Sequence, residues 1–253
     1  MLLPRKSVVL KSASELKRMR AGGAILKRVV DHVAGLVRPG VTTAELDEVA
    51  HRLILEAGAT PACLGYHGFP ASICTSVNAE IVHGIPSHRV LQEGDIVSID
   101  CVLLYDGLYT DMAVTVPVGR ISHEAQTLLR VTKESLQRAI KQARPGRYVG
   151  DISVAVQRHV EAHGFSVIRE YAGHGVGHAV HEEPAVFNFG LPKRGPLLCP
   201  GLVLAIEPMV SVGNWKTRVL EDGWTVVTTD GSLSAHFEHT VAVTENGPLV
   251  LTA

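Results

Sequence analysis

Apolar positions recur at helical spacing in four segments of the chain, which form two pairs. The first segment opens with a capping-box pattern at Ser12 and Glu15, and Thr42 and Glu45 repeat this pattern at the start of the second. Pro-Gly punctuation ends the first and third segments. The four predicted helices cover residues 12–38, 42–58, 122–144 and about 151–164.

Alternating and apolar runs between these segments predict antiparallel strands. Residues 94–100 alternate, Asp106 and Gly107 give a turn signal, and residues 108–118 form a partner strand. A glycine-rich stretch at residues 63–70 comes before them and reads as a loop.

The second half of the chain repeats the first. Residues 37–58 align with residues 143–164 without a gap, at a constant shift of 106 positions that takes Gly40 to Gly146. Three further pairings follow in the same order: 82–86 with 180–184, 94–100 with 201–207, and 111–116 with 238–243. We therefore predict an α+β fold with two pseudo-symmetric halves, about 12–120 and 121–250, each a helix pair on an antiparallel sheet. We expect residues 1–253 to form a single catalytic domain with one continuous core.

Composition narrows the class of protein. A chain of 253 residues with 46% hydrophobic content can bury a sizeable core. Its net charge of −1 gives no basic footprint, so we expect no specific nucleic acid and no anionic membrane as the main partner. Residues 1–11 lack the apolar core of a signal peptide, and no run approaches a bilayer span, so we expect a soluble cytoplasmic protein.

Cysteine spacing excludes a structural zinc ribbon. Cys63, Cys74, Cys101 and Cys199 lie far apart and form no Cys-x-x-Cys pair. In a cytoplasmic protein we expect reduced thiols. We interpret Cys101 and Cys199 as small buried apolar residues.

Three histidines lie among glycines at residues 173–184, and His174 and His181 are the candidates for chemistry. Glycine lets the backbone approach a ligand closely, so an imidazole here can be held near a metal or a substrate. A lone histidine is more often structural, however. These histidines therefore indicate a functional site only if carboxylates from elsewhere in the chain lie close to them.

Four acids supply that convergence. Asp100 and Asp111 lie on predicted strands of the first half, and Glu207 and Glu238 on equivalent strands of the second. Acids are depleted in strands, and solvent-facing positions would explain them, but Ile99 and Ile206 end apolar runs that favour burial. Four buried carboxylates repel one another, and two divalent cations would balance their charge.

The donor set indicates the class of ion and reaction. Oxygen ligands with an imidazole and no thiolate suit Co, Mn, Fe, Zn or Ni, and the sequence does not choose among them. Two such ions would acidify a bridging water to hydroxide. The pattern therefore predicts metal-assisted hydrolysis.

This ordered set of residues resembles the type I methionine aminopeptidases of the pita-bread superfamily. The resemblance runs from about residue 12 to residue 250. The most specific phrases are His-Gly-Ile-Pro86, Gly-His-Gly-Val-Gly177, His-Glu-Glu-Pro184, Ile-Glu-Pro208 and Glu-Asp-Gly-Trp224.

The resemblance implies a role for each site residue. Asp100 would hold one of two divalent cations, Asp111 and Glu238 would bridge both, and His174 and Glu207 would complete the other sphere. Glu207 would also take the proton of the attacking water. His181 would stabilise the oxyanion of the scissile carbonyl. His83 would contact the peptide nitrogen and assist its departure.

The resemblance also implies a pocket for the methionine side chain, lined by Cys63, Tyr66, Phe69, Cys74 and Trp224. From the residues alone, ordinary core packing explains these positions equally well. His67 would contact the residue after methionine, and His178 has no assigned role. The family has a tyrosine in place of Phe69 and an aromatic residue in place of Val180. Loss of the latter ring predicts weaker selectivity for methionine over leucine or norleucine.

The implied function is removal of the initiator methionine from nascent polypeptides with a small second residue, in the cytoplasm, by a monomer. The ribosome is a candidate partner, although no docking motif is evident. A prolidase or proline-specific aminopeptidase is the nearest alternative, but such enzymes carry an extra N-terminal domain. A binding module without catalysis is the alternative from another class, and its members lose the ligands that are present here.

Overall fold

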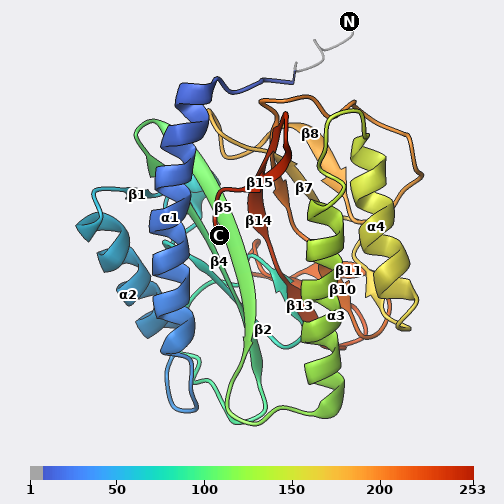
Figure 1. Ribbon diagram of the computed structural model, residues 1–253. Helices are drawn as coiled ribbons and strands as arrows, with labels where there is room; N and C mark the ends of the chain where they lie inside the picture. Colours follow the sequence, from blue (N-terminus) through green and yellow to red (C-terminus); the bar gives the residue numbers. More distant parts are fainter. Residues whose placement is uncertain (1–7) are drawn as a thin grey trace, which may run out of the picture.

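The computed structural model describes residues 8–253 and contains four α-helices within them (Figure 1). They are α1 (Ala13–Gly35), α2 (Thr43–Glu56), α3 (His123–Ile140) and α4 (Val149–Glu161). Both expected capping boxes are present: the side chains of Ser12 and Thr42 accept the N–H of Glu15 and Glu45, whose carboxylates accept the N–H groups of the caps. The four helices predicted from the sequence are confirmed.

Each half contributes one larger antiparallel sheet. In the first half, β4 (Ile96–Tyr105) pairs with β5 (Leu108–Pro117) on one edge and with β1 (Thr60–Pro61) and β2 (Cys74–Val77) on the other. In the second half, five strands follow the order β15-β14-β9-β7-β8. Their bounds are Gly247–Val250, His239–Thr244, Val203–Ile206, Ala172–Gly175 and Glu182–Phe187.

Two three-stranded sheets complete the fold. One has the order β13-β10-β6, and the other, β11-β12-β3, pairs the first half with the second. Their bounds are Ser234–His236, Met209–Ser211 and Ser166–Val167, and then Thr217–Val219, Val226–Thr228 and Glu80–Val82. A short 3-10 helix, η1, spans Tyr66–Gly68. The α+β class with two similar halves is confirmed.

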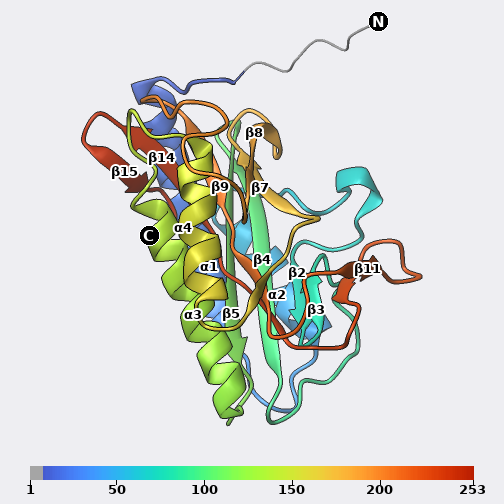
Figure 2. The ribbon, with the colours of Figure 1, turned by 90° about the vertical axis from the view of Figure 1, so that its right-hand side faces the viewer.

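Helices α1, α3 and α4 lie on one side of the molecule, opposite β3 and β11 (Figure 2). Helix α1 packs on β4 and β5, while α3 and α4 pack on each other and on second-half strands. Each helix pair buries its own apolar cluster, and a third cluster joins Met19 and Leu108 to Val176 and Val203 across the halves. This cluster, and the half-buried Val114 that packs against both large clusters, make the interior continuous.

Strand β5 and residues 236–240 form a seam between the halves. The Thr115 hydroxyl donates to the His236 carbonyl and accepts the His236 N–H, both at 2.8 Å. Two residues along, the Glu238 N–H donates to the Ala113 carbonyl at 2.8 Å. The Thr240 hydroxyl then accepts the Asp111 N–H and donates to the Asp111 carbonyl, again at 2.8 Å. The seam therefore holds Asp111 and Glu238 side by side.

Residues 1–7 lie outside the described part of the chain, so the expectation about a targeting segment falls largely beyond it. Among residues 8–253, no helix combines the length and apolar character that crossing a membrane requires.

Candidate metal centre

A cavity of about 150 Å³ lies between the halves, and the candidate residues line it. Every site residue predicted from the sequence lines it except His67. His67 is exposed on η1 and stacks edge-on against Tyr66, with ring centroids 4.4 Å apart. The lining residues are Ala62, Cys63, Tyr66, Phe69, Cys74, His83, Asp100, Val102, Asp111, His174, Val180, His181, Glu207, Trp224 and Glu238.

One donor group at the base of the cavity has the geometry of a metal site. Asp111, His174 and Glu238 are all buried, and each offers a ligand atom within 4.8 Å of the others. The His174 Nδ1–H donates to the Gly175 carbonyl at 2.9 Å, which fixes the tautomer. The Nε2 lone pair is then free to face Asp111 Oδ2 at 3.7 Å and Glu207 Oε1 at 3.6 Å.

The sequence predicted that all four acids lie on strands, and this is wrong for two of them. Asp100 and Asp111 lie inside β4 and β5, but Glu207 follows the last residue of β9 and Glu238 precedes the first residue of β14. Aspartates therefore serve inside the strands, and the longer glutamates serve just outside the strand ends.

Burial dominates the electrostatics of the acids. It raises the pKa of Asp111, Glu207 and Glu238 well above the ordinary carboxyl value, and neighbouring carboxylates raise it further. Burial raises the pKa of Asp100 as well. The same cause lowers the pKa of His174 to about 3, so its imidazole is neutral at physiological pH.

The donor chemistry fits a divalent cation. Asp111 Oδ1 and Glu238 Oε1 are buried without any hydrogen-bond partner, and an unpaired buried oxygen is costly. A cation placed among these oxygens would satisfy them and offset the mutual repulsion of the carboxylates. Carboxylate oxygens and a neutral imidazole are suitable ligands for such an ion.

Two further histidines line the same cavity. His83 follows β3 with a φ of 60° and lies edge-on to Tyr171 and Trp224, with centroids 5.9 and 6.3 Å away. Burial lowers the pKa of His83 to about 4. His181 lies at the exposed edge of the cavity, 4.3 Å from His174 between ring centroids. Its Nδ1 is hydrogen bonded to the Tyr66 hydroxyl at 2.7 Å, so its Nε2 is left available.

Aromatic and sulfur-containing side chains form the apolar wall of the cavity. Phe69 meets Trp224 edge-on, with centroids 5.1 Å apart, and both pack with Cys63 and Cys74. Val180 lines the same cavity. Such a wall suits a thioether side chain, because sulfur and aromatic edges attract each other.

The cysteine expectations are confirmed except at one position. All four thiols are free, and Cys101 is buried, but Cys199 is only half-buried because it lies in a surface connection that precedes β9.

The sequence reasoning missed several neighbours of the site. The most notable is His236, which is 1% exposed and whose Nε2 lies 3.5 Å from Glu207 Oε2 and 3.9 Å from Glu238 Oε2. Its position two residues before Glu238 was the available signal, since alternate residues of an extended segment share a face. Tyr171, Ala62 and Val102 carried no comparable signal.

Comparisons with known proteins give consistent results. The family model described as metallopeptidase family M24 matches residues 17–245. Methionine aminopeptidase of Clostridium perfringens is 51% identical over 245 residues, covering 97% of this chain and 98% of the relative. The crystal structure of methionine aminopeptidase from Rickettsia prowazekii superposes with a TM-score of 0.96 at 40% identity, covering 98% of this chain and 100% of the other.

A prolidase from Pyrococcus furiosus shares the fold at lower similarity. Its TM-score is 0.77 at 21% identity, and the match covers 97% of this chain but only 65% of the prolidase. At this identity, the likeness concerns the fold alone.

Proposed function

Because the chain belongs to metallopeptidase family M24, we propose that it is a methionine aminopeptidase that hydrolyses the peptide bond after an N-terminal methionine. One observation carries this proposal. A single cavity joins a buried acid and histidine cluster, suited to divalent cations, to a wall of aromatic and sulfur side chains suited to methionine. Residues from both halves line that cavity, so residues 1–253 would act as one catalytic domain.

We assign five donors, three of them buried and two half-buried, to two divalent cations. Asp100 would bind one, Asp111 and Glu238 would contact both, and His174 and Glu207 would complete the second. The unpaired oxygens of Asp111 and Glu238 support this assignment. When bound, the cations supply positive charge and lower the pKa of water in the site. Co, Mn, Fe, Zn and Ni all fit the donor set.

The remaining steps belong to side chains. Glu207, beside the cluster, would accept the proton of the attacking water and pass it to the leaving amine. His181, held by Tyr66, would donate a hydrogen bond to the oxyanion that forms from the scissile carbonyl. The neutral imidazole of His83, which lines the same cavity, would contact the peptide nitrogen.

The substrate side of the proposal follows the shape of the site. The methionine side chain would pack against the wall formed by Cys63, Phe69, Cys74 and Trp224. Exposed His67 would meet the rest of the peptide at the mouth. We propose N-termini of nascent polypeptides with a small second residue as substrates, in the cytoplasm, with the enzyme a monomer and the ribosome a candidate docking partner.

The decisive experiment measures metal content and methionine release together. Enzyme stripped by a chelator should be inactive on Met-Ala-Ser, and titration with Mn, Co, Fe, Zn or Ni should restore release of free methionine, saturating near two ions per chain. Saturation at one ion would contradict the two-cation assignment. A parallel assay with an Ala-Pro peptide tests the prolidase alternative, and cleavage of that peptide in preference to Met-Ala-Ser would overturn the proposal.

A further inference from the structure

Lys11 is a buried lysine beside residues 178–182, the histidine loop, which carries His181. Lys11 is 4% exposed, although it lies only a few residues from the start of the described chain. Its N–H donates to the Gly201 carbonyl at 2.7 Å. A Cβ on Gly177 would lie 2.2 Å from the Lys11 Cε, and one on Gly201 would lie 2.8 Å from the Lys11 carbonyl oxygen. Two glycines therefore make room for this side chain and its backbone.

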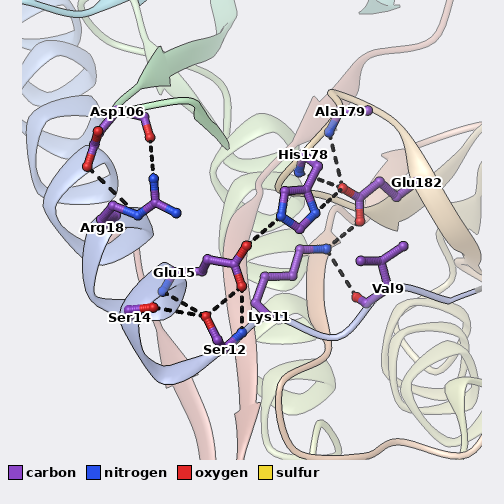
Figure 3. Close-up of polar contacts among 10 residues, drawn as sticks. All are labelled: Val9, Lys11, Ser12, Ser14, Glu15, Arg18, Asp106, His178, Ala179 and Glu182. Carbon is purple, nitrogen blue, oxygen red and sulfur yellow. Dashed lines mark hydrogen bonds and ion pairs between the residues drawn. The ribbon is translucent and has the colours of Figure 1, made fainter.

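The ammonium group of Lys11 forms an ion pair with Glu182, the last residue of the histidine loop (Figure 3). Lys11 Nζ pairs with Glu182 Oε2 and also donates to the Val9 carbonyl at 3.2 Å. Glu182 Oε1 accepts the N–H of His178 at 2.6 Å and that of Ala179 at 3.1 Å. The carboxylate thus sets the backbone of residues 178–182, the turn that carries His181.

Two more contacts tie this loop to the first half of the chain. His178 Nε2 lies 2.6 Å from Glu15 Oε1, and Glu15 belongs to the capping box of α1 (Figure 3). The hydrogen bond from the Ser12 side chain is the main cause that lowers the pKa of Glu15 to about 2, so this carboxylate is ionised. The Tyr109 N–H donates to the Gly177 carbonyl at 2.8 Å.

We propose that Lys11 is a positioning residue for His181, acting through Glu182. Neither Lys11 nor Glu182 lines the cavity, so neither touches substrate. Tyr66 fixes the imidazole ring of His181, and the Lys11–Glu182 pair fixes the backbone that precedes it, at His178 and Ala179. A buried ion pair with both partners satisfied holds its surroundings in one arrangement, whereas one lost partner leaves a buried charge and a loosened loop. This inference rests on the proposed function.

A double-mutant cycle separates positioning from simple structural support. Lys11→Met should lower kcat on Met-Ala-Ser on the order of 10- to 100-fold, the range seen when a supporting partner is lost. KM and metal content should change less than twofold, because His174 and the acids keep their contacts. In a His181→Ala background, the same substitution should change kcat less than twofold, because the group it positions is gone. Lys11→Arg, which keeps the charge, should recover part of the activity.

The matched control is Lys27→Met, which removes a lysine from a half-exposed pair with Asp31 on α1 and should leave kcat unchanged. Equal loss of kcat from Lys11→Met with and without His181 would overturn the inference, as would a loss confined to metal content. Inactive wild-type enzyme with every cation would instead overturn the proposed function.

Two further variants test the inference if Lys11→Met folds poorly. Glu182→Gln keeps an oxygen for the His178 and Ala179 N–H groups but removes the charge, and Lys11→Met/Glu182→Gln removes both charges together. The double variant should fold and regain activity relative to either single variant, because no unpaired charge is left buried. If all of these variants fail to fold, the pair is a structural element and the positioning role is wrong.

Discussion

The two halves of the molecule supply equivalent acids by different means. In the first half, β4 and β5 are 10 residues each, and Asp100 and Asp111 lie inside them. In the second half, β9 and β14 are 4 and 6 residues, and Glu207 and Glu238 lie just beyond their ends. Strand pairing sets Asp111 opposite Val102, two residues from Asp100, whereas the last pair of β9 and β14 is Ile206 with His239.

This difference shows that the repeat preserves the meeting point of the carboxylates and not the register of the strands. Aspartates serve inside paired strands, and the longer glutamates serve just beyond strand ends. The seam of Thr115 and Thr240 then holds the two arrangements against each other. The halves are therefore alike in fold, but only the first-half acids lie inside paired strands, so we expect those acids to tolerate a change of side-chain length less well.

The largest expected effect is removal of one acid from each half. Asp111→Asn and Glu238→Gln should each lower kcat/KM for Met-Ala-Ser on the order of 10³-fold, equivalent to about 4 kcal/mol. Both halves would contribute equally, because both carboxylates have an otherwise unpaired buried oxygen. Asp31→Asn, at an exposed pair on α1, is the control. A loss below tenfold for one acid alone would mean that one half dominates the site.

Changing side-chain length should distinguish the halves. Asp100 lies in β4 between Cys74 of β2 and Ala113 of β5, so its backbone cannot shift to accommodate a longer side chain. Glu207 lies one residue beyond the paired part of β9, so strand pairing restrains its backbone less. Asp100→Glu should lower kcat/KM by about 100-fold, as a displacement of about 1 Å does, and Glu207→Asp should lower it less. The reverse order in steady-state kinetics would contradict the proposed difference in rigidity.

The seam between the halves is tested by Thr240→Val. This substitution leaves the buried N–H and carbonyl of Asp111 without the partner they share, and should lower the free energy of unfolding by about 2 kcal/mol. Urea unfolding measures the change. Thr127→Val removes a hydroxyl that donates to the His123 carbonyl on an exposed helix face and should have little effect. Equal losses of unfolding free energy in the two variants would mean that the seam stabilises the fold no more than an exposed helix hydrogen bond does.

The charge of the cluster predicts how stability depends on pH without metal. Burial raises the pKa of Asp111, Glu207 and Glu238. Their stabilisation is complete below the ordinary carboxyl pKa of about 4 and is lost as pH rises through the raised values. The lowered pKa of His174, about 3, acts oppositely: its contribution is present above the ordinary value of about 6.5 and is lost as pH falls.

Between about pH 7 and pH 8, histidine is neutral and the buried thiols of Cys74 and Cys101 are protonated in both the folded and unfolded states, so the carboxyls dominate the dependence. Metal-free protein should then lose up to about 1.4 kcal/mol per pH unit for each proton that the folded cluster keeps and the unfolded chain has released. Thermal melts at rising pH measure this loss. Added Mn should flatten the dependence, and Asp111→Asn/Glu238→Gln should reduce it. A metal-free Tm that rises above pH 7 would contradict the buried charge cluster.

The smallest expected effect concerns two equivalent valines. Val82 and Val180 each precede a site histidine, but only Val180 lines the cavity. Val180→Phe should tighten selectivity for methionine over leucine and norleucine about threefold, or about 0.7 kcal/mol, because the added ring fills the wall. The ratio of kcat/KM values for peptides differing only at the first residue measures it. Wild-type discrimination no weaker than that of the variant would refute the prediction.

Much of the fold could be predicted from local patterns. The capping boxes at Ser12 and Thr42 fix helix starts, and the turn at Asp106 and Gly107 fixes the hairpin, because neighbours in sequence decide these features. The repeat then predicted two similar halves, and it indicated Asp100, Asp111, Glu207 and Glu238 as matched positions before any coordinates were known.

Features that depend on the meeting of distant segments could not be predicted. The burial of Lys11 against Glu182 and the strand ends at Glu207 and Glu238 carry no signal at helix or strand period. The spacing of His236 from Glu238 indicates a shared face but not the distance of His236 from Glu207. The sequence by itself determined which residue types were present and which local elements they form. Only the tertiary structure decided how closely carboxylates, histidines and a buried lysine approach one another, because those distances follow from packing two halves together.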